Sequence, residues 1–149
     1  MSYLDQFARL VPLDHGLCVV ATRRTDGTPH ATVVNAGVTV NPTTSKPCVA
    51  FVAAGGSRKL AHLRADPTIS VTVRASWEWA TVDGTATIIG PDDEHPDVDG
   101  DALRLLLRTV FTDAGGTHDD WDTYDRVMRD ERRAAVLVTP HRVYGVAQG

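Results

Sequence analysis

Apolar and polar residues alternate along several short stretches of the chain, a pattern typical of strands that bury one face. The stretches that show it are residues 17–23, 28–40, 48–54, 68–74 and 77–89, and an apolar run follows at 134–139. Thr25-Asp26-Gly27 separates the first two, and its glycine suits the positive φ of a tight hairpin turn. Gly84 interrupts the fifth stretch and predicts a bulge or a close approach of another backbone. The pattern therefore predicts mainly antiparallel β structure.

Apolar residues at helical spacing mark four further segments. The first ends at Pro12, and the second, residues 57–65, ends at the Asp66-Pro67 break. The third ends at Gly115-Gly116, and the fourth begins at Thr117. The inward positions expected on the last two are Leu103, Leu106, Leu107, Val110, Phe111, Tyr124, Val127 and Met128. With five or six strands and these helices in the connections, the chain is expected to fold as one mostly β domain over residues 1–149. Closure into a small barrel would protect its strand edges.

The charge of the chain changes sign locally. Its 15 basic and 19 acidic residues give a net charge of −4, which argues against a nucleic-acid binder with a broad basic surface. Residues 57–66 reverse this balance, because three basic side chains there stand against Asp66 alone. A basic segment on an acidic protein favours a small anionic ligand.

Both cysteines, Cys18 and Cys48, lie inside apolar runs and are interpreted as packing residues. Two such cysteines provide neither a disulfide framework nor a zinc-binding spacing. The first ten residues lack the basic and apolar regions of a signal peptide, and no apolar stretch reaches membrane-spanning length. We therefore expect a soluble, cytoplasmic protein without a membrane partner.

The most informative segment is Gly55-Gly56-Ser57-Arg58-Lys59, where an apolar run ends in two glycines and a short basic helix begins. Glycine lets the main chain approach a ligand, and Ser57 can cap the helix, whose free N–H groups attract an anion. Arg58 and Lys59 add full positive charges beside that helix end. The segment is interpreted either as a phosphate site or as an ordinary strand-to-helix turn with solvated basic residues.

Two tryptophans stand two residues apart in Trp77-Glu78-Trp79, at the start of the fifth predicted strand. The pleat of a strand would put both indoles on one face and Glu78 on the other. This aromatic surface would either pack into the core, stack on a planar cofactor or fill a dimer interface.

Two acidic clusters resemble metal sites but have simpler interpretations. Residues 91–101 contain six carboxylates, yet they lack the alternating ligands and closing glutamate of an EF-hand, so we interpret them as a solvated loop. His118 stands beside several aspartates, which we interpret as the cap and first turn of the following helix. No metal site is predicted.

No catalytic residue is predicted either. The six histidines are scattered, and the sequence contains neither a Gly-x-Ser-x-Gly elbow nor a His-Glu-x-x-His helix. A phosphate-binding turn and an aromatic surface, without an evident acid, base or nucleophile, fit a protein whose bound cofactor carries the chemistry.

Three segments in this order resemble the split β-barrel flavin and deazaflavin oxidoreductases of the pyridoxamine 5'-phosphate oxidase class. They are Asp26-Gly27-Thr28-Pro29-His30, Lys59-Leu60-Ala61-His62-Leu63-Arg64-Ala65-Asp66-Pro67 and Trp77-Glu78-Trp79-Ala80-Thr81-Val82-Asp83-Gly84-Thr85-Ala86. The resemblance extends from Leu17 to Gly145, nearly the whole chain. Within the class, the chain resembles the actinobacterial branch that uses the deazaflavin coenzyme F420.

This resemblance implies a homodimer of six-stranded antiparallel split barrels, of the FMN-binding type with two to four short helices, and two cofactor sites at the interface. Strand residues would line the ring system, the start of the basic helix would hold the phosphate, and Trp77 would approach from the interface. The cofactor-binding residues implied are His30, Thr32, Val33, Asn35, Val52, Ser57, Arg58, Lys59 and Trp77.

The function implied is an F420-dependent oxidoreductase that transfers a hydride from the reduced deazaflavin to a conjugated, small organic acceptor. FMN offers a similar tricyclic ring and phosphate, so an FMN-dependent oxidoreductase is the first alternative. A non-catalytic F420-binding protein is the second. Vitamin B6 oxidation is not expected, because the C-terminal Trp and Arg-x-His element of authentic pyridoxamine-phosphate oxidases are replaced by His141-Arg142-Val143-Tyr144-Gly145.

Overall fold

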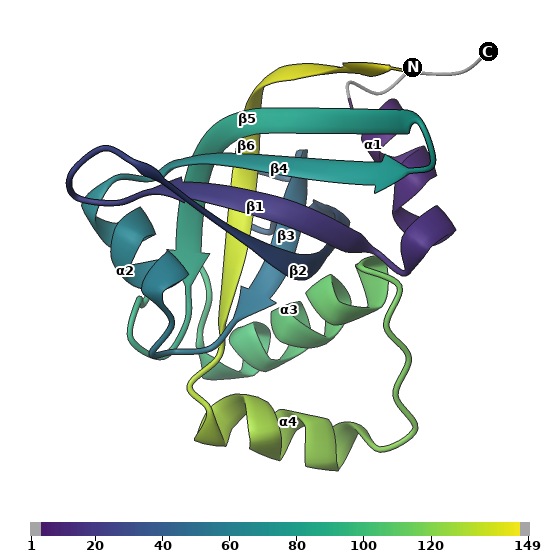
Figure 1. Ribbon diagram of the computed structural model, residues 1–149. Coiled ribbons are helices and arrows are strands. Elements are labelled where there is room, and N and C mark those ends of the chain that lie inside the picture. Colours follow the sequence, from purple (N-terminus) through teal and green to yellow (C-terminus); the bar gives the residue numbers. More distant parts are fainter. Residues whose placement is uncertain (1–3, 147–149) are drawn as a thin grey trace.

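The computed structural model describes residues 4–146, which form a closed barrel of six antiparallel strands in the order β1-β2-β3-β6-β5-β4 (Figure 1). The strands are β1 (Leu17–Arg23), β2 (Pro29–Val40), β3 (Pro47–Ala53), β4 (Thr68–Ala75), β5 (Glu78–Ile89) and β6 (Ala134–Val146). The helices are α1 (Asp5–Leu10), α2 (Arg58–Ala65), α3 (Gly100–Asp113) and α4 (Trp121–Asp130), with a 3-10 turn η1 (Val11–Asp14). The predicted mostly β barrel with short flanking helices is confirmed.

Inward side chains from the strands fill the interior of the barrel. The pairing of β1 with β2 sets Cys18 opposite Val34, and alternate residues of both strands share this inner face. Two helices close the ends, with α1 and α2 at opposite ends of the barrel in Figure 1. Phe7 and Leu10 of α1 and Leu60 of α2 are completely buried in the same apolar cluster.

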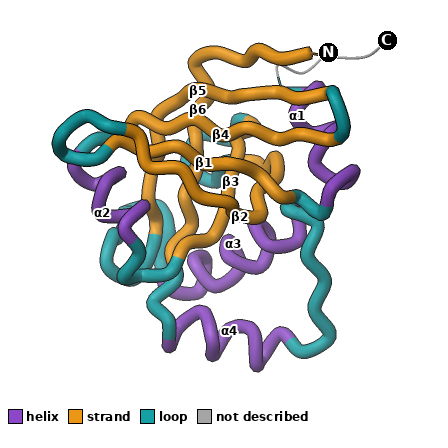
Figure 2. The backbone as a smooth tube through the Cα atoms, viewed as in Figure 1, coloured by secondary structure: helices purple, strands orange, loops and turns teal. Residues whose placement is uncertain are grey.

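A second apolar cluster lies outside the barrel, where Figure 2 shows α3 between the strands and α4. Leu106 of α3 packs there with Ala50 of β3 and Leu137 of β6, and Tyr124 joins α4 to the cluster. Helical spacing predicted this inward face, but the prediction was wrong for Val127, whose side chain is 38% exposed. The reason is that α4 packs on one side only.

The long strands β5 and β6 bend together at an irregularity. Their register shifts between Asp83 and Gly84, and a Cβ on Gly84 would overlap the carbonyl oxygen of Thr139. This confirms the close backbone approach predicted for that glycine. Beyond it β6 continues to Val146, whereas the sequence predicted a strand ending at Thr139. Pro140 lies beside the irregularity. Because proline cannot donate a hydrogen bond to a strand ladder, its presence in the sequence argued against a strand beyond Thr139.

Several local predictions are also confirmed. Gly27 adopts a φ of 85° in the β1–β2 turn, and Asp120 caps α4 by accepting a hydrogen bond from the Thr123 amide at 3.1 Å. Burial raises the pKa of both Cys18 and Cys48 to about 12, so the thiols stay protonated and serve as packing groups.

No helix within residues 4–146 is long and apolar enough to cross a lipid bilayer.

One outer face of the barrel is left uncovered by the described helices, which lie around β1 and β4 rather than over them in Figure 1. We call it the open face and define it by a row of outward residues that the pairing register aligns across five strands. These residues are Val33, Val19, Thr72, Thr81 and Tyr144, of which Thr81 is buried and bonds the Thr72 hydroxyl at 2.7 Å. Val33, Val19 and Tyr144 are 63%, 45% and 43% exposed. The open face thus presents apolar surface to its surroundings.

Candidate functional site

The turn between β3 and α2 has the local geometry that the sequence predicted. Ser57 caps α2, and its Oγ accepts a hydrogen bond from the Leu60 amide at 3.5 Å. A Cβ on Gly55 would lie 2.6 Å from the carbonyl oxygen of Arg132, so the close passage of these two segments requires glycine. A Cβ on Gly56 would meet nothing within 4 Å, which leaves open space beside the start of the helix.

This turn opens onto a groove of about 450 Å³ on the outside of the barrel. One wall comes from β2, β3 and the start of α2, and the opposite wall comes from α3, α4 and the residue before β6. The lining residues are Val33, Val34, Asn35, Val52, Ala53, Ala54, Ser57, Lys59, Val110, Phe111, Ala114, Tyr124, Met128 and Arg133. The groove therefore brings together five of the nine predicted cofactor residues, namely Val33, Asn35, Val52, Ser57 and Lys59.

The groove is apolar along its walls and polar where α2 begins. Val52 and Met128 contribute aliphatic surface from opposite sides, and Phe111 adds an aromatic ring. Ser57 and Lys59 lie at the helix start, where the first turn leaves backbone N–H groups without intrahelical acceptors. A flat apolar body with an anionic group suits this arrangement.

Two predicted site residues, His30 and Thr32, face the barrel interior instead of the groove. Thr32 lies opposite Val20 in the β1–β2 pairing and shares its inner face, whereas Val33 points outward. The His30 ring contacts that of His62 with a centroid distance of 4.9 Å. His30 Nδ1 and Thr32 Oγ1 are buried and have no hydrogen-bond partner among the described residues. Both side chains thus lie behind the strand that borders the groove.

The surroundings of His30 make this end of the barrel electropositive. Desolvation lowers the pKa of His30, and the positive charges of His62, Arg24, Lys59 and Arg58 lower it further. Arg58 is exposed and does not line the groove, but its charge contributes to the same region. Positive charge gathered at the start of α2 favours an anionic ligand there.

Trp77 lies at the other end of the molecule from α2. It occupies the turn between β4 and β5, where its side chain is 80% exposed, and neighbouring Glu78 forms an ion pair with Arg9 of α1 at 2.7 Å. The prediction that the pleat sets both indoles on one face was wrong, because β5 begins only at Glu78. Trp79 packs edge-on against Tyr144, with a centroid distance of 6.0 Å. Within one chain, Trp77 and the groove are not brought together.

Sequence reasoning did not assign four prominent groove residues to the site. Phe111, Tyr124 and Met128 were predicted to face inward on their helices, and that spacing was the available signal. The Tyr124 hydroxyl donates to the Leu107 carbonyl oxygen at 3.0 Å, and burial raises the pKa of this phenol to about 12. Arg133, between α4 and β6, had no recognisable pattern around it.

Comparisons with known proteins agree with this fold. A family model described as "Pyridoxamine 5'-phosphate oxidase" matches residues 4–147. A conserved hypothetical protein from Mycobacterium tuberculosis has a TM-score of 0.63 at 20% identity, covering 97% of this chain and 84% of that one. An F420 reductase has a TM-score of 0.61 at 16% identity, covering 91% and 94%. A heme binding protein from Mycobacterium smegmatis has a TM-score of 0.65 at 18% identity, covering 98% and 54%. The structural likenesses show the fold, and the family match spans nearly the whole sequence: the chain belongs to the pyridoxamine 5'-phosphate oxidase family.

Proposed function

We propose that the groove binds the deazaflavin coenzyme F420 and that the protein is an oxidoreductase acting on a conjugated organic acceptor. The observation that supports this most directly is the position of Ser57 and Lys59, which open onto the same groove as Val33, Asn35 and Val52. A helix start suited to a phosphate and an apolar slot are thereby contiguous. The likeness in fold to an F420 reductase is in keeping with this cofactor.

The polar and apolar residues of the groove match the phosphate and the ring of a phosphorylated tricyclic cofactor. Lys59 would supply an ammonium and Ser57 a hydroxyl to the phosphate, together with first-turn amides of α2. Val33 and Val52 would contact the ring from the strand side, and Phe111 would contact it from the helix side. The Asn35 amide nitrogen donates to the His15 carbonyl oxygen at 2.8 Å, which fixes the orientation of its side chain at the rim.

The protein's own residues would bind and orient the cofactor and exclude water. When bound, F420 supplies the hydride chemistry. Tyr124 is a neutral phenol near pH 7, as an ordinary tyrosine is, and its hydroxyl donates to the Leu107 carbonyl oxygen. The buried thiols of Cys18 and Cys48 do not line the groove. The apolar walls would keep the ring in a dry environment, where the charge on Lys59 acts more strongly than in water.

A second copy of the chain would complete this site. Trp77 lies far from the groove of its own chain, while Val33 belongs both to the groove and to the exposed open face. Pairing of two open faces would bury their apolar residues and could bring the partner's turn between β4 and β5 toward the groove. We therefore propose a homodimer with the cofactor sites at its interface.

FMN is the alternative cofactor, because the family takes its name from a pyridoxamine-phosphate oxidase, a flavin enzyme class, and FMN presents a similar ring and phosphate. Parallel titrations of the cofactor-free protein with F420 and FMN, followed by fluorescence, distinguish the two. Preferential binding of F420 supports the proposal. Preferential binding of FMN would show that the groove is a flavin site. Turnover of reduced F420 with quinones, enones and tetrapyrroles then separates an enzyme from a binding protein.

The two lysines of the chain provide a matched test of the phosphate site. Lys59→Ala is expected to remove a charge-assisted contact and weaken F420 binding by roughly one to two orders of magnitude. Lys46→Ala, in the exposed loop before β3, removes the same charge away from the groove and should leave the dissociation constant unchanged. Equal dissociation constants for wild type and Lys59→Ala would exclude Lys59 from the site.

A further inference from the structure

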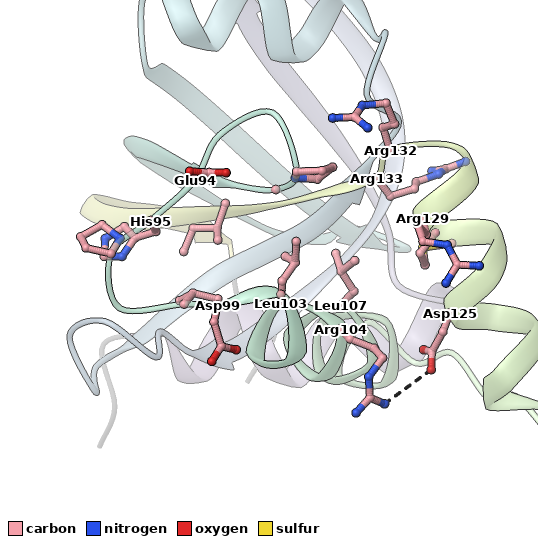
Figure 3. A pocket seen from close by; sticks show the side chains of 17 residues that line it. Glu94, His95, Asp99, Leu103, Arg104, Leu107, Asp125, Arg129, Arg132 and Arg133 are labelled. Atoms are coloured by element: carbon pink, nitrogen blue, oxygen red, sulfur yellow. Dashed lines mark ion pairs between the residues drawn. The ribbon is translucent and has the colours of Figure 1, made fainter.

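A second cavity of about 650 Å³ lies between the loop at residues 90–99, the first half of α3 and the second half of α4 (Figure 3). Met128 and Arg133 separate it from the groove, since both residues line both spaces. Its volume falls within the range of pockets that hold small organic molecules. Nothing in the proposed cofactor site makes use of it.

The floor of the cavity is apolar. Leu103 and Leu107 of α3 point into it in Figure 3, and Ile89, Val98 and Met128 also line it. Leu107 and Ile89 are only 5% and 1% exposed and belong to the apolar cluster under α3, so the floor is held in place by the fold. Such a floor favours the apolar body of a ligand over water.

The rim is rich in guanidinium groups. They belong to Arg104, Arg129, Arg132 and Arg133. All but Arg129 form a short ion pair with a neighbouring carboxylate. Among the described residues, the ion pair of Arg129 is a 3.9 Å contact with Asp130, and both side chains are at least two-thirds exposed. A pair that long and that exposed contributes little, so the Arg129 guanidinium can serve a ligand.

The acidic residues that line the cavity are engaged with other groups or lie opposite Arg129, and Asp125 also pairs with Arg104 at 3.5 Å (Figure 3). Asp99 caps α3 by accepting from the Ala102 amide at 2.8 Å. The Arg108 guanidinium bonds Asp125 and holds the pKa of that carboxyl below its usual range. Glu94 stands on the loop across the cavity from Arg129 in Figure 3. The cavity thus has a basic end at α4 and an acidic residue at the far end, which would orient an anionic ligand.

We propose that this cavity binds a small amphipathic carboxylic acid. Its apolar body rests on Leu103 and Leu107, and its carboxylate pairs with Arg129. This ligand is separate from the cofactor, so the proposal does not depend on the identity of the group in the groove. Because Met128 and Arg133 form a common wall, the bound acid lies next to the groove without entering it.

The test uses 2-naphthoate and its uncharged counterpart 2-naphthamide, each titrated into the full-length, cofactor-free protein by isothermal calorimetry. Naphthoate should bind saturably at one site per chain and several-fold more tightly than the amide, as expected for one ion pair with a largely exposed guanidinium. Arg129→Gln should abolish this preference. Arg126→Gln is the matched control, because it removes the same charge from an exposed position of α4 outside the cavity lining.

Leu103→Trp tests the location of the ligand by filling the cavity, and it should reduce the binding of both compounds at least tenfold. Thermal melting shows whether this variant folds; if it does not, the exposed Arg129→Gln variant decides the question. The proposal is overturned by equal affinity for acid and amide, by absence of saturable binding, or by wild-type affinity in Arg129→Gln. Wild-type affinity in a folded Leu103→Trp variant also overturns it.

Discussion

At the scale of single residues, His30 should make the stability of the protein depend on pH. Its pKa lies below the ordinary value of 6.5, first because the ring is desolvated and then because cationic groups surround it. Between the lowered pKa and 6.5 the unfolded chain binds more protons at this histidine than the folded chain. The free energy of unfolding should therefore rise with pH across that window and lose this dependence above it.

His30→Gln removes the titrating group. It should therefore reduce the slope of the free energy of unfolding against pH below the ordinary histidine pKa. Urea unfolding at a series of pH values between about 5 and 7.5 measures the slope in wild type and variant. The exposed His141→Gln, on the Thr85 side of the barrel, controls for the loss of one imidazole. An unchanged acid-side slope in His30→Gln would contradict the assignment.

The same residues show how far a sequence can specify a site. Ser57 and Lys59 were predicted from local chemistry, because a cap and a helix start depend on neighbours in the chain, and the structure brings both to the groove. On β2, however, Thr32 and Val33 sit side by side in sequence and on opposite faces of the strand. Which face meets the groove depends on what covers each side, and that is set by distant helices. The sequence pattern of a single strand cannot determine it.

At the scale of elements, the C-terminus of α3 is held against β2 by a close backbone approach. A Cβ on Gly37 would overlap the carbonyl oxygen of Asp113, and the Thr39 hydroxyl donates to the Asp113 carboxylate nearby. Gly37→Ala should therefore push α3 outward and lower the free energy of unfolding by about 1–3 kcal/mol, measured by urea denaturation. A loss of less than about 0.5 kcal/mol would show that α3 can shift without cost.

Gly100→Ala provides the control of opposite sign for that experiment. Gly100 is the first residue of α3, and a Cβ there would meet nothing within 4 Å. Alanine at this position should stabilise the protein by about 0.4–1 kcal/mol, because it restricts the unfolded chain without a clash in the folded one. The two variants together separate the loss of a glycine from the loss of close helix–strand contact.

Elements with a strong local signal were predictable, and the exceptions have a physical cause. The hairpin at Gly27 and the cap at Asp120 follow from turn and capping chemistry, and the structure contains both. The second half of β6 was missed because Pro140 and the polar residues after it resemble a tail. They form a strand only because β5 offers a partner across an irregular register, which is a long-range effect.

At the scale of the whole molecule, the barrel was predictable and its open face was not. The number of alternating stretches favours a closed sheet, whereas the row through Val19, Thr72 and Tyr144 exists only once five strands are in register. This row places exposed valines beside the groove, which is why we propose a second copy of the chain as its cover. A solvent-facing apolar surface next to a site that one chain leaves incomplete is typical of an interface between two chains.

Val19→Glu tests the dimer within the open face. Val19 is 45% exposed in one chain, so the folded monomer should accept the glutamate, whereas a symmetric interface would bury two unpaired carboxylates. The dissociation constant of the dimer should rise at least about 100-fold, measured by sedimentation equilibrium. Val40→Glu makes the same substitution at a 61% exposed valine outside the row and should leave the association unchanged.

If the wild-type protein sediments as a monomer at micromolar concentration, the two-copy site is wrong. Loss of F420 affinity in Val19→Glu, with no loss in Val40→Glu, would in turn connect assembly to cofactor binding, because one chain alone leaves Trp77 remote from the groove.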